Sequence, residues 1–212
     1  MSRAGRGARS GYPARTGIFA SRAEIKGVER LRASVAVAAL VGTLTGVPLA
    51  AATGTDPAAN GARAVITAQP GLDAQIVSRL NAIRVDHGLR RLTPAPGLAA
   101  AARLHSRQMA LSGRFQHESL DGSAFWKRIR RVYGAAGFRT WTVGENLLWW
   151  SPTATAADVA SGWLDSPPHR QNLLNPSWCE IGVSAVHDTA APGDFEGLET
   201  TIVTADFGCR RR

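Results

Sequence analysis

Two segments near the C-terminus alternate apolar and smaller side chains, and this alternation constrains the fold more than any other feature of the sequence. Residues 181–185 and 203–207 each place an apolar side chain at every second position, which is typical of half-buried strands. If the two segments pair as antiparallel strands with Ile181 opposite Phe207, all their apolar pairs lie on one face. The sequence therefore predicts a hairpin that covers a core with one side.

The N-terminal 52 residues have the layout of a secretory signal peptide. Residues 33–52 form a run of twenty residues without a charged side chain, preceded by a basic stretch and ended by small residues. A transmembrane anchor is the alternative, since about 20 apolar residues span a bilayer, but glycines, threonines and Pro48 interrupt this run. We expect a signal peptide over 1–52, a linker over 53–71, one folded domain over 72–208 and a C-terminal tail over 209–212.

The same hairpin register brings the two cysteines of the chain, Cys179 and Cys209, opposite each other. An exported protein meets an oxidising environment, where two thiols placed face to face form a bond. We therefore predict a disulfide between Cys179 and Cys209, with two free thiols as the alternative.

The formal net charge of +9 does not indicate nucleic-acid binding. Eight basic and only two acidic side chains lie within residues 1–32, so most of the positive charge belongs to the predicted leader. The remainder has too small an excess to form the basic surface that binds a polyanion. We expect no nucleic-acid partner.

Helical spacing of apolar residues predicts four helices, over about 73–88, 96–113 and 123–132 and from Thr155 onward. Residues 140–143 alternate weakly as a strand, which we expect Gly144 to break. His105 lies on the apolar face of the second helix and is expected to pack there rather than to bind a ligand. The third helix is expected to expose its basic side chains to solvent; these are Lys127, Arg128, Arg130 and Arg131.

Three further stretches place a histidine or a glutamate beside a chain-breaking residue or a helix end. They contribute His117, Glu145 and His169, and two imidazoles with one carboxylate can bind a divalent transition metal. A nucleophilic site is the alternative, because Ser166 and His169 are one helical turn apart and Glu145 can orient the imidazole. The long spacings leave both interpretations open.

These stretches also carry a resemblance to a known family. From about Leu72 to Gly208 the chain resembles the CAP superfamily, or SCP domain, of cysteine-rich secretory, antigen 5 and plant pathogenesis-related proteins, and most of all its short bacterial branch. Six motifs in order support it: LNAIR (Leu80–Arg84), FQHES (Phe115–Ser119), GENL (Gly144–Leu147), W-x-x-S-P-x-H-R-x-N-L-L (Trp163–Leu174), EIGV (Glu180–Val183) and DFG (Asp206–Gly208).

The resemblance implies an α+β fold, an α-β-α sandwich with a central antiparallel sheet between helical layers, and a secreted protein. It also implies a cleft where two histidines and two glutamates can bind a divalent cation such as zinc. By position, His117, Glu145 and His169 match three of these four residues, and Ser166 stands at the place of the second glutamate. Because a hydroxyl replaces a carboxylate there, we expect weaker affinity for a dication.

The function expected from the sequence is a secreted CAP protein whose cleft binds a ligand or a divalent cation, at the cell envelope or on an extracellular partner. An extracellular hydrolase using His117, Glu145 and His169 is the first alternative, and lipid or sterol binding is the second. The expected ligand is a small molecule, a glycan or a lipid. We further expect no membrane attachment after cleavage of the leader, and a monomer.

Overall fold

The computed structural model of the protein describes residues 16–26 and 64–212. The strands are β1 (Thr16–Lys26), β2 (Ile66–Ala68), β3 (Thr93–Pro94), β4 (Thr140–Trp150), β5 (Glu180–Ala191) and β6 (Leu198–Arg211). The helices are α1 (Pro70–Asp86), α2 (Pro96–Ser112), α3 (Phe125–Val132), α4 (Ala156–Asp165) and α5 (Pro167–Leu173), with a short 3-10 helix at Gly193–Phe195.

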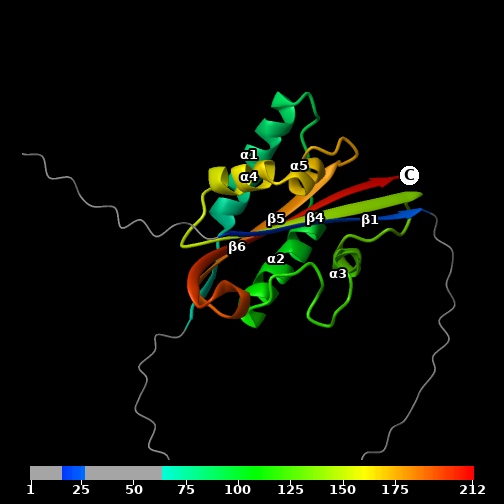
Figure 1. Ribbon diagram of the computed structural model, residues 1–212. Coiled ribbons are helices and arrows are strands. Elements are labelled where there is room, and N and C mark those ends of the chain that lie inside the picture. The colour runs from blue at the N-terminus through cyan, green and yellow to red at the C-terminus, as the bar shows by residue number, and fades with distance from the viewer. Residues whose placement is uncertain (1–15, 27–63) are drawn as a thin grey trace, which may run out of the picture. The chain divides into compact units, whose positions relative to one another are not determined.

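A mainly antiparallel sheet lies between two helical layers, as Figure 1 shows. The strand order is β1-β4-β6-β5-β2, and β3 forms a short parallel pairing with β5. Helices α1, α4 and α5 cover one face and α2 and α3 cover the other. The expected α-β-α sandwich is confirmed.

The hairpin predicted near the C-terminus is confirmed in its register. Strands β5 and β6 pair with Ile181 opposite Phe207, Val183 opposite Ala205 and Ala185 opposite Val203. These side chains belong to the core on the α1 and α4 side of the sheet. Cys179 and Cys209 form the predicted disulfide. Strand β6 continues to Arg211 and so includes most of residues 209–212, which we expected to be a tail.

The helix boundaries follow from local signals in the sequence. Helix α2 begins at Pro96, whose fixed φ suits a first helical turn, and it ends at Ser112, directly before Gly113, which adopts a left-handed φ of 69°. Thr155 caps α4 in a reciprocal pair of hydrogen bonds with Asp158. Pro167 and Pro168 start α5 directly after α4, and Ser166 between the two helices has an extended backbone.

The expectation that Gly144 breaks a strand is wrong. Strand β4 continues through Gly144 as far as Trp150. A Cβ atom on Gly144 would lie 2.7 Å from Cζ2 of Trp178 and 2.8 Å from Oδ1 of Asn172. Glycine is therefore required here because side chains from the α5 region pack directly against the strand, and not because the chain turns.

The sheet also includes two strands that lie before residue 72, where we expected the folded domain to begin. Strand β1 pairs with the whole of β4, although it falls within residues 1–52, and β2 falls within the predicted linker. The apolar run over 33–52 lies outside the described residues, so the signal peptide stays a prediction. Among the described residues, no helix is long and apolar enough to cross a membrane.

The disulfide yields a testable prediction for stability. Replacing both Cys179 and Cys209 by serine should lower the free energy of unfolding by about 3–4 kcal/mol, because the bond closes a loop of 30 residues in the unfolded chain. Urea unfolding of the two proteins measures the difference. Equal midpoints and slopes would contradict the prediction.

Candidate functional site

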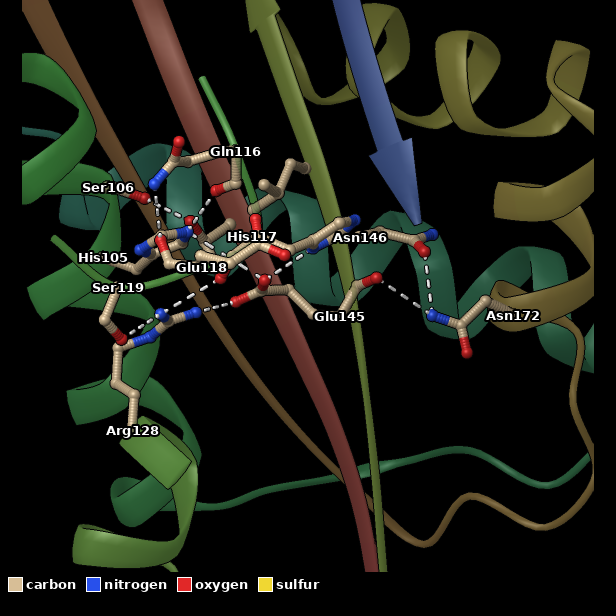
Figure 2. Close-up of polar contacts among 12 residues, drawn as sticks. His105, Ser106, Gln116, His117, Glu118, Ser119, Arg128, Glu145, Asn146 and Asn172 are labelled. Carbon is tan, nitrogen blue, oxygen red and sulfur yellow. Dashed lines mark hydrogen bonds and ion pairs between the residues drawn. The ribbon is translucent and has the colours of Figure 1, made fainter. Parts of the chain in front are cut away.

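The site is built around Glu145, in the middle of β4. Its side chain lies on the face of the sheet covered by α2 and α3, and none of it is exposed to solvent. An isolated carboxylate is costly to bury, so compensating partners are required. Figure 2 shows these partners converging on Glu145 from α2, from α3 and from the loop between them.

Both carboxylate oxygens of Glu145 are engaged by nitrogen donors. His117 Nδ1 lies 2.7 Å from Oε1, and Arg128 Nη2 donates a charge-assisted hydrogen bond to Oε2. Burial alone raises the pKa of Glu145, but the nearby His105, Arg128 and His117 lower it to about 2. Glu145 is therefore a carboxylate at neutral pH.

Arg128 also fixes the loop that carries His117. Its Nη1 donates to the His117 carbonyl at 3.3 Å and to Ser119 Oγ at 3.1 Å. Its side chain is buried, so the expectation that every basic side chain of α3 faces solvent is wrong for Arg128. The other three, Lys127, Arg130 and Arg131, are exposed as expected.

His105 completes the cluster from α2. It is buried as expected, its Nε2 lies 2.8 Å from the Gln116 carbonyl, and the same nitrogen is 4.0 Å from Glu145 Oε1. Burial is the main cause that lowers the pKa of His105 to about 4. The His105 imidazole is therefore neutral at physiological pH, and it packs beside the Glu145 carboxylate as a polar neighbour.

A second carboxyl group lies next to Glu145 and was not identified from the sequence. Asp206 pairs with Glu145 in the ladder between β4 and β6, and its side chain is fully buried. Burial, and then the negative charge of Glu145, raise the pKa of Asp206 well above its ordinary value. We infer that Asp206 holds a proton while Glu145 does not.

Asn146, the next residue of β4, points to the opposite face and holds α5. Its Nδ2 donates to the His169 carbonyl at 3.1 Å, and Asn172 Nδ2 donates to Asn146 Oδ1 at 2.9 Å. Asn172 Nδ2 also reaches the Glu145 carbonyl at 3.3 Å. These contacts anchor α5 at the same point along β4 where the carboxylate cluster lies on the other face (Figure 2).

His169 is buried on α5, and its Nδ1 lies 2.6 Å from Ser166 Oγ. The expected proximity of Ser166 and His169 is thus confirmed, because Ser166 precedes the first turn of α5. Of the three predicted site residues, His117 and Glu145 are in direct contact. The backbone carbonyl of His169 is held by Asn146 on the α5 face of β4, and a cleft shared by all three residues stays a prediction.

The Glu145 carboxylate is poorly placed to bind a divalent cation. The Glu145 carboxylate already bonds Arg128 and His117, and a guanidinium next to it opposes a second positive charge. Among residues 64–212, no group of three or more His, Cys, Asp or Glu side chains is arranged to hold a metal ion. Zinc binding remains a prediction from the resemblance alone.

Arg128 and Asp206 are the main residues that sequence reasoning missed. A signal for Asp206 is present, since it is a charged residue within the apolar alternation of residues 203–207. The sequence hardly indicates that Arg128 is buried, because its neighbours on α3 are also basic. Only its position on the buried face of the helix distinguishes it from the exposed Lys127, Arg130 and Arg131. Both residues lie far from Glu145 along the chain.

Two curated relatives from Bacillus subtilis (strain 168) match part of the chain. The uncharacterized protein YkwD is 32% identical over 115 residues, which are 54% of this chain and 42% of that protein. The uncharacterized membrane protein YlbC is 33% identical over 111 residues, 52% of this chain and 30% of that protein. The chain thus spans less than half the length of these relatives.

Solved structures show the same fold. An extracellular protein containing an SCP domain from Bacillus anthracis matches with a TM-score of 0.50 and 28% identity, over 68% of this chain and 41% of that one. An outer surface protein from Borrelia burgdorferi matches with a TM-score of 0.50 and 20% identity, over 64% of this chain and 90% of that one. At that identity the second likeness concerns the fold alone.

The model of the cysteine-rich secretory protein family, CAP, matches residues 77–207, which include α2 to α5 and the strands that carry Glu145 and Asp206. The motifs, the sandwich and this match agree, and the chain belongs to the CAP family.

Proposed function

We propose that this chain is an extracellular CAP-domain protein that binds a ligand beside β4 without turnover. The observation that carries the proposal is the state of Glu145, whose two oxygens bond His117 and Arg128. A carboxylate that is fully buried and neutralised by a guanidinium is poorly suited to accept a proton from a substrate. It is well suited to orient His117, whose side chain is 15% exposed.

Extracellular location is supported by the leader and by a relative. The Bacillus anthracis structure is described as an extracellular protein containing an SCP domain. The disulfide also suits an oxidising compartment, where such bonds form and persist. An extracellular location therefore best explains both the predicted leader and the disulfide.

A hydrolase is the second candidate, favoured by one contact. Ser166 Oγ and His169 Nδ1 lie 2.6 Å apart, which is the distance expected between a nucleophile and its base. The carboxylate that would orient His169 in such a triad is engaged elsewhere, because Glu145 bonds His117 and Arg128 on the opposite face of the sheet. The two carboxylate oxygens of Glu145 therefore bond residues other than His169.

Export can be tested directly. When the full chain is expressed in a bacterial host, the protein in the culture medium should begin near Thr53, because signal peptidase cleaves after small residues such as those ending at Ala52. N-terminal sequencing of the secreted protein identifies the start. Protein in the medium that retains residues 16–26, or complete retention in the cells, would contradict export by cleavage.

Absence of turnover can be tested with a panel of a simple ester, a peptide and peptidoglycan. We expect no hydrolysis above that of the matched variants Ser166→Ala and His169→Gln, because the Glu145 carboxylate, which would orient His169 in a triad, bonds His117 and Arg128 instead. Product release is followed by absorbance and chromatography. Hydrolysis by the wild-type protein that both variants abolish, while their thermal unfolding is unchanged, would establish the hydrolase instead.

A further inference from the structure

The outer edge of β4 is covered by an N-terminal segment of the same chain. Strand β1 pairs antiparallel with β4 over its full length, from Thr16 opposite Trp150 to Lys26 opposite Thr140. Ser21 lies opposite Glu145, at the centre of the site. The covering strand lies outside the part of the chain that matches the CAP family, which begins at residue 77.

Without β1, the edge of β4 would be open to another strand. Proteins protect exposed edges with lysine, proline, bulges or short length. Strand β4 has 11 residues, contains neither lysine nor proline, and has a regular register with its neighbours. Its one charged side chain, Glu145, is buried on one face of the sheet and so does not prevent another strand from pairing at the edge.

The position beside this edge brings a bound strand close to both parts of the candidate site. Helix α5, which carries His169, packs against β1 as well as against β4. Figure 2 shows β1, in blue, alongside β4 on the side of Asn146 and Asn172. A chain in the place of β1 therefore pairs with the backbone of Glu145 and touches the helix that bears the second histidine.

We propose that the outer edge of β4 is a binding groove for an extended peptide, which residues 16–26 fill in the precursor and vacate when the leader is removed. The peptide adds to the sheet as an antiparallel strand, so its main chain supplies the hydrogen bonds and its sequence is read only by the neighbouring side chains. This inference rests on the proposed function and names its ligand class, an extended polypeptide.

The experiment uses the full chain with a protease site placed between residues 27 and 63. The protein is cut after folding, the released N-terminal fragment is separated, and a fluorescent peptide of residues 16–26 (TGIFASRAEIK) is added. We expect saturable one-to-one binding by anisotropy. Amides of residues 140–150 should exchange with deuterium faster after the fragment leaves, and slow again when the peptide binds.

The matched control is the same peptide with Ala20→Pro and Ser21→Pro. Alternate amides of a strand face its neighbour, so one of two adjacent prolines must remove a hydrogen bond to β4. We expect this peptide to bind at least tenfold more weakly. Equal binding of the two peptides would overturn the proposal, because the peptide would then bind without pairing as a strand with β4.

Two further outcomes also overturn the proposal. If β5 and β6 lose their exchange protection when the fragment leaves, β1 is an integral part of the fold and not a removable occupant. If the cut protein dimerises and excludes the peptide, the edge accepts a second copy of this chain. The binding assay needs neither export nor the absence of turnover, so a failure of the proposed function leaves its result unaffected.

Discussion

The site depends on keeping one negative charge, that of Glu145, inside the sheet. Moving a carboxylate out of water costs several kcal/mol even after the protein relaxes. The charge is kept because Arg128 and His117 bond its oxygens, while burial and the Glu145 charge raise the pKa of the neighbouring Asp206 and favour its neutral form. Breaking such a buried pair by removing one partner costs about 3–5 kcal/mol, so these residues constrain one another.

This constraint connects elements that are distant along the chain. Arg128 reaches from α3 across the loop at His117 and Ser119 to β4, and so fixes the position of the imidazole. On the other face, Asn146 holds α5 through its contacts with His169 and Asn172. Three consecutive residues of β4 thus have three different roles. Gly144 allows close packing of Trp178 and Asn172. Glu145 bonds the residues on one face of the sheet, and Asn146 bonds α5 on the other.

Much of the fold was predictable from the sequence because its signals are local. Alternation fixed the register of β5 with β6, and the register placed Cys179 opposite Cys209. Proline and glycine marked the ends of α2. The prediction that Gly144 ends a strand was wrong, because the sequence alone does not distinguish a glycine required by packing against Trp178 from a glycine required by a turn.

The site was less predictable because its partners meet only in three dimensions. His117, Glu145 and His169 were identified as candidate site residues, and the first two are in direct contact. Arg128 resembles its exposed basic neighbours, and Asp206 enters the site only through the ladder between β4 and β6. The pairing of residues 16–26 with β4 has no counterpart in the sequence analysis, since that stretch has the composition of a leader.

The most direct test of this account is the ionisation of Glu145, followed by carbon NMR of the side-chain carboxyl during a titration from neutral pH to about pH 3. The account predicts that Glu145 remains a carboxylate throughout, consistent with a pKa of about 2, while Asp206 is already protonated. A Glu145 midpoint at or above its ordinary value of 4.5 would contradict the account.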